Sequence, residues 1–286
     1  MVYASKSGVT PDPAIHGLNL IGNPFTCGFD WDDFTNDLGG SPGISEAIYF
    51  TKDNAVASYV GGVGTNSGTN HVPPMQGFFV KAYKDTTISI STGYREHNTT
   101  DRFKGSTIIP LVRLELANDL YGDEAVIRMD ENATTSYDNK FDAIKFKFNS
   151  DVRPSIWSSL SGKDYVINRV PFPENSMVIP LVINSPKADS LKITATQIEG
   201  LEDYDLTLKD LDQNVNIDLN NVNEYSFFAD SRTVTDRFIL TVTNLASGLP
   251  DIFEPEPEKT FNIYSSRERL YISPEKEKWN GKKGDL

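Results

Sequence analysis

Hydrophobic and polar residues alternate with a period of two along much of the chain. Successive side chains of a β-strand point to opposite faces, so this alternation indicates strands with one buried and one solvated face. The segments with the pattern are 144–148, 191–195, 204–208, 215–219 and 238–242. Helical periodicity is almost absent, and only residues 32–38 are expected to form a single helical turn.

Five further strands are predicted nearer the N-terminus, at residues 18–21, 47–50, 57–60, 77–83 and 87–91. Short strands separated by Gly, Asn, Asp and Pro are typical of antiparallel sandwiches. The sequence therefore predicts an all-β protein, with antiparallel β-sandwich domains of the jelly-roll or immunoglobulin-like type in tandem. In the alternating strand at 144–148, Lys145 and Lys147 are expected to face outward and protect an edge.

Changes in composition divide the chain into four predicted parts. Residues 1–106 form an N-terminal β domain that ends in a polar segment, and residues 107–246 form a β-sandwich domain. Residues 247–260 are rich in Pro and Glu, which is typical of an extended linker. Residues 261–286 begin a further pair of strands.

The net charge of −13 makes nucleic acid and anionic membrane surfaces poor partners, because both carry negative charge. The single cysteine, Cys27, excludes an intrachain disulfide and a cysteine-based metal cluster. No apolar run is long enough to predict a transmembrane span. The first residues lack the basic start and apolar core of a signal peptide, so we expect a fragment of a longer precursor.

Two separated blocks carry a more specific pattern. Residues 17–31 read GLNLIGNPFTCGFDW and residues 72–80 read VPPMQGFFV, while residues 125–144 read AVIRMDENATTSYDNKFDAI. These blocks resemble the all-β region that Bacteroidetes surface proteins exported by type IX secretion carry before their sorting domain. Leu18 stands where that pattern usually has Trp. Residues 261–286 resemble the opening third of a type A C-terminal sorting domain.

The resemblance implies a secreted protein that passes through the periplasm, engages the type IX secretion machinery and stays at the outer-membrane surface. It implies an adhesin-like or structural binding module whose partner is a protein or a glycan at the cell surface. The sequence leaves two alternatives open. One is a carbohydrate-binding module of a polysaccharide-degrading system, and the other is a hydrolase with two exposed carboxylates about 5–10 Å apart.

A cluster of oxygen-bearing side chains is the candidate metal site. Ca²⁺ takes six to eight oxygen ligands, which closely spaced Asp, Glu and Asn side chains supply from a loop. The cluster consists of Asp130, Glu131, Asn132, Asp138 and Asp142. The alternative is a set of Asx-turns, in which the same side chains bond their own backbone.

Aromatic residues with acidic neighbours are the candidate ligand site, because a Trp face packs on sugar C–H groups and carboxylates accept hydroxyl protons. The candidates are Trp31, Asp30, Asp33, Tyr59 and Trp157. For Trp31 the alternative is a core residue at the start of a helix, with the acids favoured by the helix dipole.

We expect no enzyme and no catalytic residues. The only histidines are His16, His71 and His97, and no two have the spacing of a metal site. The chain also lacks the G-x-S-x-G nucleophile motif.

Overall fold

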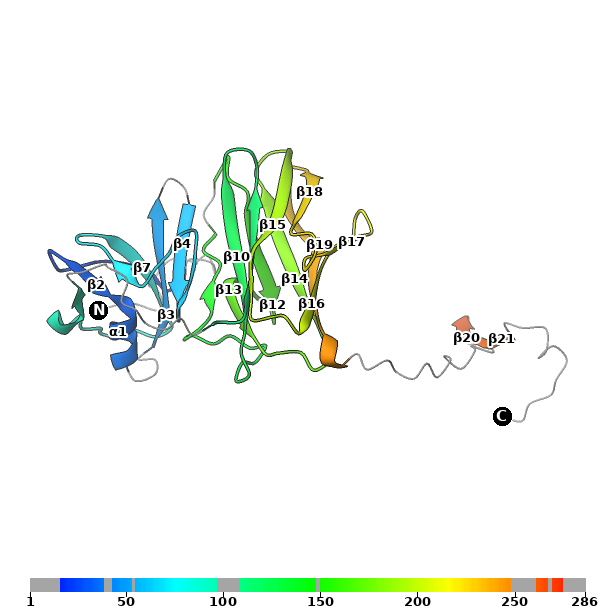
Figure 1. Cartoon of the computed structure of the whole chain (residues 1–286), viewed down its shortest axis with the longest axis horizontal. Helices are drawn as coiled ribbons and strands as arrows, with labels where there is room; N and C mark the ends of the chain where they lie inside the picture. Colours follow the sequence, from blue (N-terminus) through cyan, green and yellow to red (C-terminus); the bar gives the residue numbers. More distant parts are fainter. Residues whose placement is uncertain are drawn as a thin grey trace. The chain divides into compact units, whose positions relative to one another are not determined.

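The computed structural model describes residues 16–38, 43–52, 55–96, 108–147 and 150–247, together with the backbone of 261–266 and 269–274. The chain forms two compact units, Met1–Leu245 and Ala246–Leu286 (Figure 1). The second unit holds an antiparallel hairpin of β20 (Phe261–Ser266) and β21 (Arg269–Pro274). This hairpin confirms the strand pair predicted there, whereas nearly all of the predicted linker, from residue 248 on, lies outside the described residues.

A five-stranded antiparallel sheet forms the N-terminal part of the first unit. Its strands, in spatial order, are β1 (Leu18–Gly22), β7 (Gly77–Ala82), β3 (Ile44–Lys52), β4 (Ala55–Val60) and β5 (Val63–Thr65). Strand β3 is buried on both faces. Ile44 and Ile48 enter one hydrophobic cluster, and Ala47 and Tyr49 enter another. The sheet therefore separates two hydrophobic cores.

The first of these cores lies between the sheet and helix α1 (Trp31–Asp37). Trp31 and Phe34 are fully buried there, together with Phe78 of β7. Strands β6 (His71–Val72), β2 (Gly28–Asp30) and β8 (Arg95–Glu96) form a small sheet, and β2 leads directly into helix α1. Tyr94 of the 3₁₀ turn η1 (Thr92–Tyr94) packs against this core. The helix confirms the single turn predicted from the sequence.

An 11-stranded sheet forms the rest of the first unit. Its main path runs β17 (Val215–Asp218), β16 (Tyr204–Asp210), β19 (Arg232–Asn244), β14 (Ser176–Ser185), β12 (Ser155–Leu160), β13 (Lys163–Val170), β10 (Gly122–Met129), β9 (Leu111–Ala117), β15 (Asp189–Glu199) and β18 (Glu224–Ala229). Strand β11 (Ala143–Ile144) pairs with β13 beside this path, and η2 (Leu245–Ser247) follows β19. All pairs are antiparallel except β10 with β13, which is parallel.

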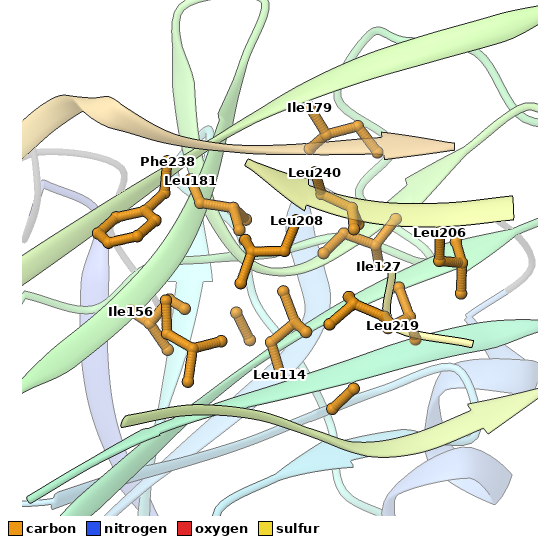
Figure 2. Packing of buried hydrophobic residues seen from close by; sticks show 14 of the residues in the cluster. Leu114, Ile127, Ile156, Ile179, Leu181, Leu206, Leu208, Leu219, Phe238 and Leu240 are labelled. Carbon is orange, nitrogen blue, oxygen red and sulfur yellow. The ribbon is translucent and has the colours of Figure 1, made fainter. Parts of the chain in front are cut away.

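The large sheet curls into a near-barrel around its own hydrophobic core. Figure 2 shows side chains of opposite strands meeting there, among them Leu114, Ile127, Leu208 and Leu240, all fully buried. Ala125, Ile127 and Met129 of β10 face this interior. The intervening Val126 faces the five-stranded sheet, where it joins the third hydrophobic cluster with Tyr49.

A buried ion pair joins the two edge regions of the near-barrel, because it links β16 and β19, which follow the edge strand β17, and also contacts the edge strand β18. Arg237 of β19 donates to Asp210 of β16, with Nη2 2.7 Å from Oδ2, and its Nη1 donates to the carbonyl of Phe228 in β18 at 3.0 Å. Tyr225 of β18 also donates to Asp210, at 3.0 Å. Arg237 reaches this position because β19 bulges: residues 235–237 lie opposite the single residue Val182 of β14.

The protein is mainly β with predominantly antiparallel sheets, as the sequence predicts. Three details differ. Residues 87–91 form no strand. Of the strand predicted at 144–148, only Ile144 lies in a strand, β11, while residues 145–147 are irregular and residue 148 lies outside the described part. Lys145 is buried instead of facing solvent. The tandem sandwich organisation and the boundary near residue 106 stay predictions, and residues 97–107 lie outside the described part. No described helix is long and apolar enough to span a membrane.

Replacing Arg237 with Met should destabilise the protein by about 3–5 kcal/mol, because Asp210 would remain buried without its cation. Burial alone would raise the pKa of Asp210, but hydrogen bonds from Arg237 and from the backbone of Gln213 outweigh burial and hold the pKa below its usual value. Urea unfolding at neutral pH measures the loss.

The matched control is Lys192→Met, which removes a cation from the exposed pair with Glu224 and should cost less than about 1 kcal/mol. Equal costs for the two variants would mean that the pair does not hold the barrel edges together. The double variant Arg237→Met/Asp210→Leu should recover much of the stability, because it leaves no buried charge unpaired.

Candidate functional site

The candidate site lies on the outer face of the near-barrel, around Trp157 of β12. Ile156 points into the barrel core, so its neighbour Trp157 points outward. Two adjoining hollows, of about 130 and 340 Å³, share Trp157, Lys147 and Thr233 in their linings. We call these two hollows the Trp157 groove.

The first hollow is lined by Ala55, Val56, Asp123, Lys145, Phe146, Lys147, Ser150, Arg153, Pro154, Ser155, Trp157, Asn184 and Thr233. The second is lined by Lys147, Trp157, Ser159, Asp164, Pro180, Val182, Thr233, Thr235 and Asp236. Both are framed by β12, β14 and β19, whose outward residues stand side by side in the sheet. The bulge of β19 supplies Thr235 and Asp236 to the second hollow.

A buried ion pair forms the floor of the first hollow. Asp123 and Lys145, 5% and 7% exposed, are joined through Oδ2 and Nζ. Asp123 also accepts the backbone N–H of Ile156 at 2.9 Å, and Lys145 donates to the carbonyl of the same residue at 3.1 Å. The other carboxylate oxygen accepts from Asn66, beyond β5, at 2.8 Å. The pair therefore fixes β10, β12 and the N-terminal region at one point.

Cationic side chains surround the Trp157 ring. The ammonium groups of Lys145 and Lys147 lie 5.8 and 5.2 Å from the ring centroid, within the range of cation–π contacts. Lys147 also pairs with Asp164 at 2.6 Å. Arg153 donates to the carbonyl of Gly122 at 2.9 Å and stacks on Tyr121.

Trp157 is 4% exposed, and its indole N–H has no hydrogen-bond partner among the described residues. A buried donor without an acceptor is unfavourable by roughly 1–3 kcal/mol. The groove thus combines hydrogen-bonding groups and cations around a largely buried tryptophan.

Only some of the predicted calcium ligands come together, and the positively charged group that they contact is Arg169. Its guanidinium lies 2.8 Å from Asp130 and 3.0 Å from Asp138, and its backbone N–H donates to Asp142 at 2.6 Å. Arg169 also holds the pKa of Asp130 below its usual value. Glu131 and Asn132 have exposed side chains at the same turn.

Local hydrogen bonds in this cluster match the Asx-turn alternative. Asp130 accepts from the backbone of Asn132 and Asp138 from that of Lys140, at 2.8 and 2.9 Å. Within the described residues no group of three or more His, Cys, Asp or Glu side chains is arranged to hold a metal ion. The calcium site stays a prediction from the sequence.

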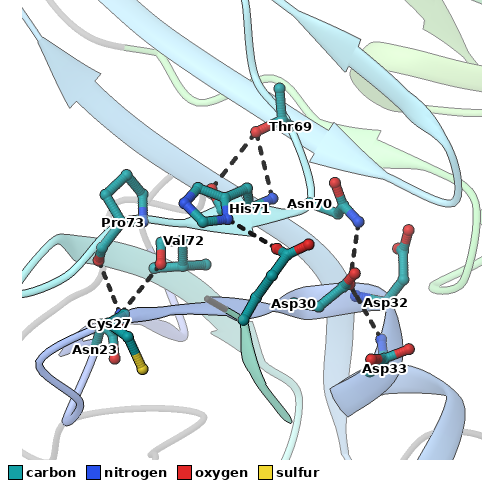
Figure 3. A network of polar contacts seen from close by, with 11 residues as sticks. Asn23, Cys27, Asp30, Asp32, Asp33, Thr69, Asn70, His71, Val72 and Pro73 are labelled. Carbon is teal, nitrogen blue, oxygen red and sulfur yellow. Dashed lines mark hydrogen bonds and ion pairs between the residues drawn. The ribbon is translucent and has the colours of Figure 1, made fainter. Parts of the chain in front are cut away.

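Four of the five predicted ligand residues lie around α1, apart from Trp157 in sequence and in the fold. Asp30 caps the helix, accepting from the backbone of Asp32 at 2.8 Å and from Asn70 at 3.0 Å (Figure 3). Trp31 is fully buried and its indole donates to the carbonyl of Glu46, which matches the core alternative. Asp33 is exposed on the helix.

Tyr59 is 6% exposed and donates its hydroxyl to Asp32 at 2.6 Å. This bond ties β4 to the first turn of α1. Of the predicted ligand residues, Trp157 is the one that lines the groove. Sequence reasoning missed Asp123, Lys145, Arg153 and Thr233, because nothing in their local pattern places them beside Trp157.

The chain belongs to a family described as a domain of unknown function, DUF8693, whose model matches residues 43–242. The match includes β3 to β19 almost entirely, and with them the Trp157 groove and the Asp210–Arg237 pair. No curated protein and no solved structure matches the chain.

Acidification should stabilise the native protein through Asp142. Burial raises the pKa of this carboxyl group to about 6, although the N–H groups of Asp138 and Arg169 partly oppose the shift. The unfolded carboxyl titrates near 3.9, so the stabilising contribution is complete below that pH and is lost as the pH rises through about 6.

Urea unfolding of the wild type and of Asp142→Asn between about pH 7.5 and pH 4.5 tests this contribution. The difference in unfolding free energy should shift by about 2 kcal/mol in favour of the wild type as the pH falls through this range. Carboxylates with a lowered pKa, such as Asp130, are present in both proteins, so their contribution cancels in the difference. A difference that does not change with pH would contradict the assignment.

Proposed function

We propose that the protein is a non-catalytic binding module of a secreted cell-surface protein, adhesin-like or structural, that holds its partner in the Trp157 groove. The observation that carries the proposal is the groove itself. It is open on the outer face of the near-barrel, and its floor is fixed by the buried Asp123–Lys145 pair. A preformed floor of this kind binds a partner with little loss of conformational entropy.

The charges of the groove support binding more than proton transfer. Lys145 is paired with Asp123 and Lys147 with Asp164. Each of these side chains is engaged in an ion pair, whereas a general acid or base must be placed to exchange a proton with a substrate. The proposal therefore assigns the side chains of the groove to recognition.

The proposed location rests on the sequence resemblance to type IX secretion cargo of Bacteroidetes. On this view the protein is exported through the periplasm, and its C-terminal hairpin opens a type A sorting domain. The first unit would serve as tandem β-sandwich modules, of jelly-roll or immunoglobulin-like type, that present the groove. Its partner would be a protein or glycan at the cell surface.

A carbohydrate-binding module is the second candidate function. The observation that favours it is the composition of the groove, where Ser155, Asn184 and Thr233 surround a tryptophan. Hydroxyl and amide side chains are suitable partners for sugar hydroxyl groups. This second candidate specifies a glycan as the partner and assigns it to the same groove.

Filling the groove should abolish binding without unfolding the protein. Thr233 is exposed in β19 and lines both hollows, so Thr233→Trp would occupy the space with a residue that strands accept well. The control, Ser226→Trp, adds the same side chain at an exposed position of β18. We expect partners found on arrays of glycans and extracellular proteins to be retained by the control and lost by Thr233→Trp.

Retention by both variants would mean that the partner binds elsewhere. Release of smaller products from a bound polysaccharide would contradict the non-catalytic assignment. The same arrays run with EDTA test the calcium prediction, because binding that needs Asp130, Asp138 and Asp142 to hold Ca²⁺ would disappear.

A further inference from the structure

The first hollow of the Trp157 groove is lined by more cations than carboxylates, although the protein is strongly acidic. The chain has a net charge of −13, yet the lining of the first hollow contains Lys145, Lys147 and Arg153 against one carboxylate, Asp123. A hollow lined by one sign of charge focuses the field and attracts the opposite charge. The first hollow is therefore suited to an anionic group.

The cations of the hollow differ in how far they are already paired. Lys145 is 7% exposed and forms an ion pair with Asp123. Lys147 shares its charge with Asp164, but its side chain is 46% exposed. Arg153 has no carboxylate within ion-pair distance among the described residues, and its known donor bond goes to a backbone carbonyl. Arg153 and Lys147 are thus the cations available to a ligand.

The second hollow has the opposite character. Asp164 and Asp236 line it beside Ser159, Thr233 and Thr235. Such groups accept hydrogen bonds from hydroxyl donors. A ligand that fits both hollows would carry an anionic group at one end and hydroxyl groups at the other. The Trp157 ring lines both hollows, so it would contact both ends of such a ligand.

An extended peptide fits the groove less well. Peptides that bind β proteins commonly add a strand to a free sheet edge. The strands beneath the groove are internal, because β12 pairs with β13 and β14, and β14 pairs with β12 and β19. Their backbone groups are already engaged, so recognition depends on side chains, as for a sugar.

We infer that the Trp157 groove binds an acidic polysaccharide, with the carboxylate of a uronic acid residue in the first hollow against Arg153 and Lys147. The sugar hydroxyl groups occupy the second hollow. This inference rests on the proposed function and names its ligand class.

Titration calorimetry with three polymers tests the inference on the full chain. The probes are polygalacturonate, its methyl ester, which has the same backbone without the charge, and polyglutamate, which has the carboxylates on a peptide. Polygalacturonate should bind, and raising the salt from about 50 to about 300 mM should weaken it by screening. The ester and polyglutamate should bind at least about tenfold more weakly.

The double variant Arg153→Gln/Lys147→Gln should weaken polygalacturonate binding by about tenfold or more. The matched control, Arg95→Gln/Lys187→Gln, removes the same charges at exposed positions outside the groove and should bind like the wild type. Unfolding curves confirm that each variant is folded.

Each other outcome overturns the inference. Equal binding of the ester shows a neutral-sugar site, and stronger binding of polyglutamate shows a site for acidic peptides. Equal losses in the two double variants show an unspecific charge effect, and the absence of polygalacturonate binding excludes this ligand class. The proposed function fails separately, when array partners are retained by Thr233→Trp.

Discussion

The buried ion pair of Asp123 and Lys145 is the interaction on which the site depends. Asp123 accepts the backbone N–H of Ile156, and Lys145 donates to the carbonyl of the same residue. The two side chains thereby make the hydrogen bonds that a neighbouring strand would otherwise make. The same carboxylate accepts from Asn66, so the pair also anchors the N-terminal region. Buried charges are tolerated only when paired and hydrogen-bonded, and this pair meets that condition on each side. The position of Trp157 follows directly from it.

A shared hydrophobic core holds the five-stranded sheet against the near-barrel. Tyr49 and Val126 meet in one hydrophobic cluster, although they come from the five-stranded sheet and the near-barrel. A polar contact reinforces the junction, because Arg128 donates to the carbonyl of Gly61 at 2.8 Å. Gly61 has a φ of +52°, and a Cβ there would lie 2.8 Å from the ring of Phe141. The junction therefore requires glycine at this turn and packs the two sheets as neighbours.

The sequence predicts strands most clearly where one face is exposed to solvent and the other is buried. Strands β15 and β16 show clear alternation and were expected, whereas β10 was missed, because its apolar residues Ala125, Val126 and Ile127 face two different cores and leave no period-two pattern. Lys145 alternates with apolar residues like a surface lysine, but its partner lies 22 residues away. Trp157 could be selected as a large aromatic residue. Its neighbours Arg153 and Thr233 could not, because only the strand order brings them together.

The limits of the family match show which parts of the fold the groove needs. Residues 43–242 contain the near-barrel, the ion pair beneath the groove and the Arg237 bridge between the barrel edges. They leave out α1, although Ile44 and Ile48 of β3 pack against Trp31 and Phe34. A chain limited to the matched region would expose that face of β3 to water, at roughly 25 cal/mol for each Å² of apolar surface. In this protein Trp31 and Phe34 cover that face, and thereby support the sheet whose strand β4 lines the first hollow through Ala55 and Val56.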